Sequence, residues 1–469
     1  MTADTLAVAV IGAGPVGLAA AANLVDRGIP VRVYEAGATV GANLRDWAHV
    51  RIFTTWEQSI DPVSRRLLEA NGWSIPQINA LPTGGDLVDR YLIPLSHVPG
   101  LADAIETDAK VTGISRQGVD KVASRGRETK PFALRIRNAD GAERVDLARV
   151  VIDASGTWRN PNPLGATGLP ALGEAAVGDR LAYGMPDILG HQRDRYAGKR
   201  VAVVGAGYSA INVLLDLTKL GERAGSLLWI VRGKNMAKIY GGGDADELAA
   251  RGKLGQHLKS LVETGKVRLI TGFATEAVAR ADADIVLSGT IDGELATLPP
   301  VDEVIVATGQ RPDLDLTREL RLELDPWLES VKVLGPMIDP NLHSCGSVSP
   351  HGHRALSHPE PGFYTIGVKS YGRAPTFLLL TGYEQARSVA AAVAGDMEAA
   401  DNVHLVLPDT GICQTDFDEK EGGCCGAPAV AKAASCCGGP AAVKEDACCV
   451  ADERAKTAGQ KGCGCEAAA

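Results

Sequence analysis

Two glycine-rich turns carry the clearest chemical signal in the sequence. They read GAGPVG at residues 12–17 and GAGYSA at residues 205–210. Each turn follows a short apolar run typical of a strand and precedes a stretch of small, helix-forming residues. Glycines at this spacing let the backbone turn tightly and approach a pyrophosphate, and the N-terminus of the following helix favours negative charge. The pattern predicts two binding sites for dinucleotides.

The first turn belongs to a predicted strand–helix–strand unit. Residues 6–11 are strand-like, a helix is expected to run to about residue 27, and residues 31–34 form the next strand. This strand ends in an acid 23 residues after the first glycine, where a carboxylate can accept hydrogen bonds from a ribose. The alternative is a glycine-rich turn in another kind of α/β unit. The predicted cofactor contacts are Gly12, Gly14, Gly17 and Glu35.

The second turn repeats this pattern with one difference. Residues 201–204 and 227–231 are the expected strands, but Arg232 follows the second strand where an acid would stand. An acid would repel a 2′-phosphate, whereas an arginine pairs with it, so we predict NADPH rather than NADH. The alternative is a solvated surface arginine. The predicted contacts are Gly205, Gly207, Ser209 and Arg232.

Three later strands deliver short turns of small residues. Residues 150–153 lead into residues 154–157, residues 304–306 lead into Thr308 and Gly309, and residues 363–366 lead into Gly367, with a helix expected near Thr376. We therefore predict an α/β fold with two Rossmann-like domains, the first split by insertion of the second. The expected boundaries are 1–158, 159–330, 331–402 and an acidic, flexible tail at 403–469.

The tail holds nine of the ten cysteines, eight of which form a regular array. Three vicinal pairs recur every 12 residues, and a Cys-Gly-Cys sequence closes the array. Neighbouring cysteines do not readily form a relaxed disulfide, but both can offer sulfur to one soft centre. The alternatives are a neutral low-complexity tail and a loose zinc site. The predicted metal or metalloid ligands are Cys424, Cys425, Cys436, Cys437, Cys448, Cys449, Cys463 and Cys465.

Composition argues against two other classes of protein. The net charge is −9, which is unlike the basic surface of a nucleic-acid-binding protein. Residues 6–25 carry no charge and are long enough to span a bilayer, but three glycines and a proline divide the run into strand, turn and helix. We expect a cytoplasmic protein without nucleic-acid or membrane partners.

The two fingerprints, their order and the short returns resemble FAD- and NADPH-dependent flavoproteins, and within them the flavin-containing monooxygenase group. The resemblance covers about residues 5–395. Disulfide reductases of the same superfamily carry a redox-active cysteine pair soon after the first acid, but residues 41–47 contain no cysteine. The acid usual in the late flavin motif is also missing, because Val368 follows Gly367. Both departures match the monooxygenase-like members better.

The resemblance implies FAD and NADPH as cofactors, and a small-molecule substrate and O2 as partners. Hydride would pass from NADPH to the flavin, and an oxygen atom would then reach a soft lone pair on S, N, Se or trivalent As. The tail is similar to the vicinal cysteine pair of mercuric reductase and to the Cys-rich ends of arsenic-resistance flavoproteins. This second resemblance implies metalloid resistance with a trivalent arsenical as substrate.

Candidate catalytic residues come from two polar stretches. Arg51 belongs to a polar and aromatic segment at 47–56 that could cover the flavin or line a channel. Tyr371 and Arg373 precede the helix expected near Thr376, whose N-terminus would stabilise negative charge on the flavin. For both stretches the alternative is ordinary packing.

Three functions remain open from the sequence. The first is a monooxygenase acting on a small, soft nucleophile. The second is a flavin-dependent metal or metalloid reductase that uses the tail cysteines as its dithiol. The third is a thiol-rich metal buffer built on a flavoprotein scaffold.

Overall fold

The computed structural model describes residues 5–221, 226–342 and 348–408 of the 469-residue chain. Two parallel sheets organise these residues, each between a layer of helices and a small antiparallel sheet. The first sheet has the strand order β16-β7-β1-β2-β3. Its strands are β1 (Val8–Ile11), β2 (Val31–Tyr34), β3 (Ile105–Glu106), β7 (Val150–Asp153) and β16 (Phe363–Thr365).

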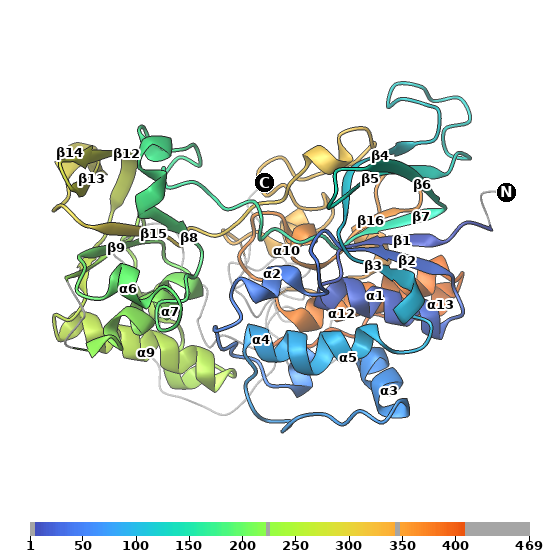
Figure 1. Cartoon of the computed structure of the whole chain (residues 1–469), viewed down its shortest axis with the longest axis horizontal. Coiled ribbons are helices and arrows are strands. Elements are labelled where there is room, and N and C mark those ends of the chain that lie inside the picture. The colour runs from blue at the N-terminus through green and yellow to red at the C-terminus, as the bar shows by residue number, and fades with distance from the viewer. Residues whose placement is uncertain (1–4, 222–225, 343–347, 409–469) are drawn as a thin grey trace, which may run out of the picture. The chain divides into compact units, whose positions relative to one another are not determined.

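The two faces of the first sheet bury different layers. In β1, Val8 and Val10 pack in the cluster formed with helices α1 (Pro15–Asp26) and α12 (Leu379–Val393). The intervening Ala9 and Ile11 pack against the small sheet of β4, β5 and β6, which Figure 1 shows on the opposite side from the helices. Because both faces are covered, apolar residues fill the strands. The small sheet consists of β4 (Ala109–Arg116), β5 (Phe132–Asn138) and β6 (Glu143–Ala148).

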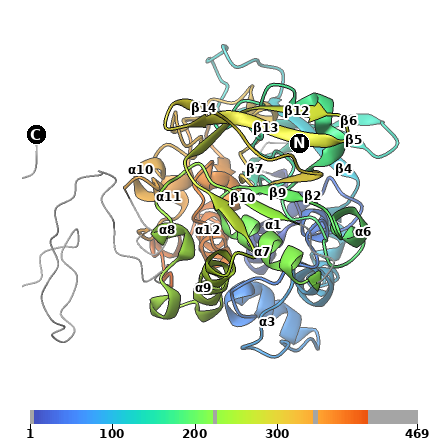
Figure 2. The ribbon, with the colours of Figure 1, turned by 90° about the vertical axis from the view of Figure 1, so that its left-hand side faces the viewer.

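The second parallel sheet repeats this layering. Its strand order is β11-β10-β9-β15-β8, and Figure 2 shows helices on one side and a small antiparallel sheet on the other. In β9, Val201 and Val203 pack toward α7 and α9, whereas Ala202 and Val204 pack toward β12 and β13. The elements are β8 (Leu181–Tyr183), β9 (Val201–Val204), α7 (Tyr208–Thr218), β10 (Leu227–Ile230), α9 (Ala249–Glu263), β11 (Arg268–Ile270), β12 (Phe273–Ala281), β13 (Asp284–Ile291), β14 (Glu294–Thr297) and β15 (Glu303–Val306).

Short helices complete the described part of the chain. Most of them border the first sheet, and two belong to the region of the second sheet. They are α2 (Ala42–Arg45), α3 (Pro62–Ala70), α4 (Gly84–Leu87), α5 (Ile93–Ser96), α6 (Arg193–Tyr196), α8 (Ala237–Tyr240), α10 (Gly335–Ile338), α11 (His353–Leu356) and α13 (Met397–Asp401). None of the helices described is long and apolar enough to cross a bilayer.

The predicted fold class is confirmed: two Rossmann-like units carry the two glycine turns. β16 joins the first sheet although it follows the whole second sheet in the chain. The domain boundaries themselves stay predictions. One helix start was wrong, because α12 begins at Leu379 and leaves Thr376 outside it. Leu378 is extended at φ −118° and ψ 152°, so the helix begins after it.

Candidate functional site

The three glycines of the first turn differ in the space around them. A side chain at Gly12 would lie 2.8 Å from the Ala154 carbonyl oxygen, and one at Gly17 would lie 1.9 Å from the Gly12 carbonyl oxygen. A Cβ at Gly14, by contrast, would meet no atom within 4 Å. Two glycines therefore allow close packing inside the protein, and the third opens a cradle at the start of α1.

The cradle has the electrostatics of a phosphate site. Gly14 caps α1 in an extended conformation, and the first bond of the helix runs from the Leu18 amide to the Gly14 carbonyl. Pro15 at the first helical position has no N–H to satisfy. The amides of the first turn have no partner within the helix, so they and the helix dipole favour an anion there.

Glu35 follows β2 at the edge of the same cradle. Its side-chain oxygens accept hydrogen bonds from the amides of Ala13 and Gly37, both at 2.8 Å. Burial raises the pKa of this carboxyl above its ordinary value. These two hydrogen bonds fix the carboxylate beside the turn, in the position where an acid can accept hydrogen bonds from a ribose.

The second turn likewise has one glycine that is packed against the protein and one that is open. Gly205 has a φ of 138°, and a Cβ there would lie 2.2 Å from the Ala307 carbonyl oxygen. Gly207 caps α7, and a Cβ there would meet no atom within 4 Å. Ser209 lies half-buried in the first turn of α7. The cradle predicted from the sequence is thus present a second time.

The residues after β10 differ from those after β2. Arg232 is exposed, and one of its guanidinium nitrogens donates to the Ala166 carbonyl oxygen at 2.6 Å. Lys234, two residues on, forms an ion pair with Asp292. Arg232 therefore presents an exposed positive charge after β10, which would suit a phosphate.

Thr308 and Gly309 form the turn after β15. The Thr308 hydroxyl donates to the Asn162 carbonyl oxygen at 3.1 Å, and the Asn162 amide donates to the Gly309 carbonyl at 2.9 Å. Gly309 needs its freedom, since its φ is 88°. These bonds tie the turn to the segment that leads into the second sheet. Their role as cofactor contacts stays a prediction.

Gly367 begins the turn after β16 and lies against the first fingerprint. Its amide donates to the Gln385 side-chain oxygen at 2.8 Å, and a Cβ on it would lie 3.4 Å from Val16. Thr376 is half-buried, three residues before the first residue of α12. The late turn and the first glycine turn therefore border the same cradle.

The three predicted catalytic residues lie in different surroundings. Tyr371 is fully buried, with ring centroids 5.7 Å from His351 and 5.2 Å from Phe377. Arg373 is held by Glu329, with nitrogen–oxygen distances of 2.9 and 3.0 Å. Arg51 is exposed and donates to the Leu81 carbonyl oxygen. Tyr371 and Arg373 share the late turn with Gly367, whereas Arg51 belongs to another segment; their catalytic roles stay predictions.

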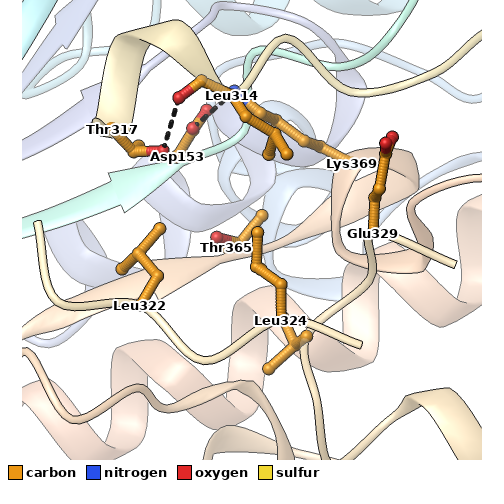
Figure 3. Close-up of a pocket in the computed structure, with 9 residues that line it drawn as sticks. Asp153, Leu314, Thr317, Leu322, Leu324, Glu329, Thr365 and Lys369 are labelled. Atoms are coloured by element: carbon orange, nitrogen blue, oxygen red, sulfur yellow. Dashed lines mark hydrogen bonds and ion pairs between the residues drawn. The ribbon is translucent and has the colours of Figure 1, made fainter. Parts of the chain in front are cut away.

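Sequence reasoning missed a buried ion pair beside the cradle. The Lys369 ammonium lies 2.7 Å from Asp153 and 3.0 Å from the Ser155 hydroxyl, and it lines a small pocket with Asp153 (Figure 3). An acid at the end of a buried strand and a lysine directly after a late glycine turn were the available signals. Neither signal indicates that the two residues meet.

The predicted metal ligands, Cys424 to Cys465, lie outside the described residues. Among the described residues there is no cysteine, and no group of three or more His, Cys, Asp or Glu side chains could hold a metal ion. The metalloid role of the tail therefore stays a prediction from the sequence.

The pyridine nucleotide-disulphide oxidoreductase family model matches residues 6–348, so the chain belongs to this family. It is an FAD-dependent oxidoreductase that uses NAD(P)H. The residues present fit both cofactors, because each cradle is open only at the glycine that faces the ligand and Glu35 and Arg232 stand at their edges. The family places the chain more broadly than the monooxygenase group that its sequence resembles.

Proteins that resemble this chain in sequence or fold include oxygenases and a reductase. An indole-3-pyruvate monooxygenase of Oryza sativa subsp. japonica is 26% identical over 214 residues, which are 46% of this chain and 45% of that protein. The bacillithiol disulfide reductase of Bacillus cereus has a TM-score of 0.60 at 20% identity, covering 83% of this chain and 99% of that one. A flavin-containing monooxygenase of Stenotrophomonas maltophilia has a TM-score of 0.52 at 20% identity, covering 83% and 98%. The two structural likenesses describe the fold.

Proposed function

We propose that this flavoprotein is an NADPH-dependent monooxygenase that transfers one oxygen atom to a small, soft nucleophile. The observation that carries the proposal is the absence of cysteine at 41–47, where a disulfide reductase would hold its redox pair, beside two intact dinucleotide cradles. The similarity to a plant monooxygenase over nearly half of the chain supports the same reading.

The overall reaction balances without a protein dithiol. NADPH, a proton, O2 and the substrate yield NADP+, water and the substrate carrying one added oxygen atom. FAD supplies the redox chemistry when bound. The protein binds the FAD pyrophosphate at Gly14, holds its ribose at Glu35, and presents NADPH from the cradle at Gly207. The late turn from Gly367 to Arg373 borders the first cradle and is the proposed origin of contacts to the flavin.

The proposed preference for NADPH rests on the residue after β10. Arg232 is exposed and donates a hydrogen bond to a neutral acceptor, the carbonyl of Ala166. A 2′-phosphate can take the place of that neutral acceptor and form a charge-assisted bond, which is stronger. An NADH ribose offers no comparable charge.

We propose a trivalent arsenical as the substrate, which would give the enzyme a role in metalloid resistance. The support is the array of three vicinal cysteine pairs and Cys463 and Cys465, because thiolates prefer soft centres. A tethered thiol array also raises the effective concentration of a thiophile near the enzyme. Trivalent arsenic carries a lone pair that can accept an oxygen atom.

The test is NADPH oxidation by full-length, FAD-loaded protein, with and without O2, in the presence of arsenite, phenylarsine oxide, a thioether or a tertiary amine. The expected result is NADPH and O2 consumption in equal amounts, with pentavalent arsenic as product. Equal NADPH consumption without O2 would overturn oxygenation. If all consumed O2 appears as hydrogen peroxide with every compound, none of them is the substrate.

The second candidate is a metal or metalloid reductase with the tail cysteines as its dithiol. The observation in its favour is that the family includes disulfide reductases while this chain concentrates its cysteines after residue 400. It predicts NADPH oxidation that continues without O2 and stops when the tail cysteines are replaced by serine. A buffer role instead predicts tight metalloid binding with no NADPH consumption that depends on the metalloid.

A further inference from the structure

A lysine and an aspartate form a buried ion pair at the end of β7. The side chains of Lys369 and Asp153 are 3% and 0% exposed, and their charged atoms are 2.7 Å apart. The Lys369 ammonium also donates to the Ser155 hydroxyl at 3.0 Å. The second Asp153 oxygen accepts from the Ser155 amide at 3.1 Å and from its hydroxyl at 2.7 Å. The pair therefore organises the turn that follows β7.

The ion pair joins two turns that both touch the first glycine fingerprint. On the Asp153 side, the Ala154 carbonyl lies so close to Gly12 that only glycine fits there. On the Lys369 side, the turn begins at Gly367, which lies against Val16 in the first turn of α1. Lys369 lies 214 residues after Ser155 and 216 residues after Asp153, so it connects parts of the cradle that the local chain does not.

The pair lies beside a small pocket that is lined largely by apolar side chains. Leucines and a valine of residues 314–331 line the pocket with it: Leu314, Leu322, Leu324 and Val331. Figure 3 shows Leu314, Leu322 and Leu324 around Thr365, with Asp153 and Lys369 beside Leu314.

Three charged or titratable neighbours need to be considered. Glu329 lines the pocket and is bound by Arg373. The Asp153 charge acts on His358, but burial dominates and lowers the pKa of His358 to about 4, so this imidazole is neutral above pH 5. Glu323 lies near His358 and forms an exposed ion pair with Lys332. Both glutamates are thus held by their own cationic partners, Arg373 and Lys332, and each leaves the Lys369–Asp153 pair to itself.

We propose that Lys369 is a positioning residue for FAD, which holds the turns after β7 and β16 against the glycine fingerprint by neutralising Asp153. The inference goes beyond the proposed function, because it concerns retention of FAD and holds for an oxygenase or a reductase. It predicts that each partner becomes a buried, uncompensated charge when the other is removed.

Removing one charge at a time should produce pH dependence of opposite sign. In Lys369→Met, Asp153 can stay buried only when protonated, so FAD binding is coupled to proton uptake and weakens as pH rises. In Asp153→Asn, Lys369 can stay buried only when neutral, so FAD binding is coupled to proton release and strengthens as pH rises. In the double variant neither charge remains, and FAD binding should regain the pH dependence of the wild type.

The experiment measures the FAD dissociation constant of full-length apoprotein by quenching of flavin fluorescence from pH 5.5 to 9. Each value is divided by the wild-type value at the same pH, which cancels the shared contribution of Glu35. We expect the ratio for Lys369→Met to rise about 10- to 100-fold across the range, the ratio for Asp153→Asn to fall by a similar factor, and the double variant to stay flat. Lys332→Met removes the exposed ion pair between Lys332 and Glu323 and is the matched control.

Thermal unfolding of each apoprotein separates loss of FAD from loss of the fold. If Lys369→Met does not fold, Asp153→Asn and the double variant still test the opposite slope and the rescue. Flat ratios in both single variants, or a double variant that binds FAD as weakly as the worse single variant at every pH, would overturn the positioning role.

Discussion

The two nucleotide cradles are built alike but differ at the edge where a ribose would lie. Both have one open glycine, Gly14 or Gly207, at the start of the helix, and both sheets are covered by helices and by a small antiparallel sheet. After the second strand, Glu35 is 9% exposed and accepts two backbone amides. At the corresponding place Arg232 is exposed and donates to one carbonyl.

This difference has a physical consequence for how long each cofactor stays. Glu35 is already fixed before FAD arrives, so binding costs little side-chain entropy at that edge. Arg232 is a long, exposed side chain that must be ordered when a phosphate binds, and the cost makes release easier. The first cradle is thus suited to a retained cofactor and the second to a cosubstrate that exchanges in each turnover.

The largest effect is expected from filling one cradle at a time. Gly14→Ala and Gly207→Ala place a methyl group where no protein atom lies within 4 Å, and both residues have extended backbones that alanine accepts. The methyl group should displace the pyrophosphate from several hydrogen bonds with backbone amides. Binding should weaken by about 4 kcal/mol, roughly 1000-fold. Gly14→Ala should yield colourless protein, and Gly207→Ala yellow protein that NADPH reduces slowly.

The comparison between the cradles fails if both variants lose FAD. Thermal unfolding of the apoproteins is the control, and both variants should unfold within a few degrees of the wild type. Gly17→Ala is a useful contrast, because its methyl group would lie 1.9 Å from the Gly12 carbonyl oxygen and should destabilise the fold itself.

A smaller effect is expected from reversing the charge after β10. Arg232→Glu should weaken NADPH binding by about 1.5–3 kcal/mol, or roughly 10- to 150-fold, because a carboxylate replaces a charge-assisted partner of the 2′-phosphate. NADH binding should change little. The measurement is the rate of flavin reduction against the concentration of each cosubstrate in stopped flow.

The control for this substitution is Arg32→Glu, which makes the same charge change at an exposed position of the first sheet. It should leave both saturation curves unchanged. Equal efficiency of NADPH and NADH in the wild type would show that the arginine does not select a phosphate.

The two Rossmann-like units also differ in how each holds a buried carboxylate, and this difference should appear in the pH dependence of stability. Asp61 caps α3 and accepts from the Ser64 amide at 2.7 Å and from the Asn23 amide group at 3.3 Å. Burial raises the pKa of Asp61 to about 6. In the second half, Asp246 is buried with Arg251, both nitrogen–oxygen contacts being 2.7 Å. The first carboxylate is therefore costly when ionised, and the second is compensated.

Asp61 should make stability fall as pH rises. Between about pH 4 and pH 6 the folded protein holds a proton that the unfolded chain has released, so unfolding becomes easier by roughly 1–3 kcal/mol over that range. Asp61→Asn should remove this pH dependence. Relative to the wild type, the variant should therefore gain more stability at pH 7.5 than at pH 4.5. Asp246→Asn should destabilise at both pH values. Urea unfolding of full-length protein measures these differences, and parallel pH profiles for wild type and Asp61→Asn would contradict the assignment.

Local sequence was sufficient for the cradles but not for what surrounds them. The glycine turns, the strands before them and the residues Glu35 and Arg232 lie within about 35 residues of one another in each unit, so period and spacing predict them. The helix expected near Thr376 begins three residues later, at Leu379, because the backbone at Leu378 is extended.

Contacts between distant segments could not be predicted from one sequence. Lys369 and Asp153 are 216 residues apart, and the Gln385 side chain that accepts the Gly367 amide belongs to a helix whose face is defined only by the finished sheet. Likewise, Arg373 pairs with Glu329, which lies 44 residues earlier in the chain. Fold topology, which no local pattern encodes, determines all three contacts.

The smallest effect on the core is expected from removing the cysteine array. Deletion of residues 420–469 should leave FAD content and NADPH reduction nearly unchanged, because both cradles are complete within residues 5–408. The free energy of unfolding should change by less than about 0.5 kcal/mol. Binding of arsenite should fall with the loss of eight paired thiols.

If the array delivers substrate, turnover at low arsenite should fall on deletion and recover at high arsenite; if it only sequesters arsenite, turnover at low total arsenite should rise. A matched full-length variant with the eight cysteines replaced by serine separates thiol chemistry from chain length. Identical turnover curves and identical arsenite stoichiometry in all three proteins would exclude any role for the array.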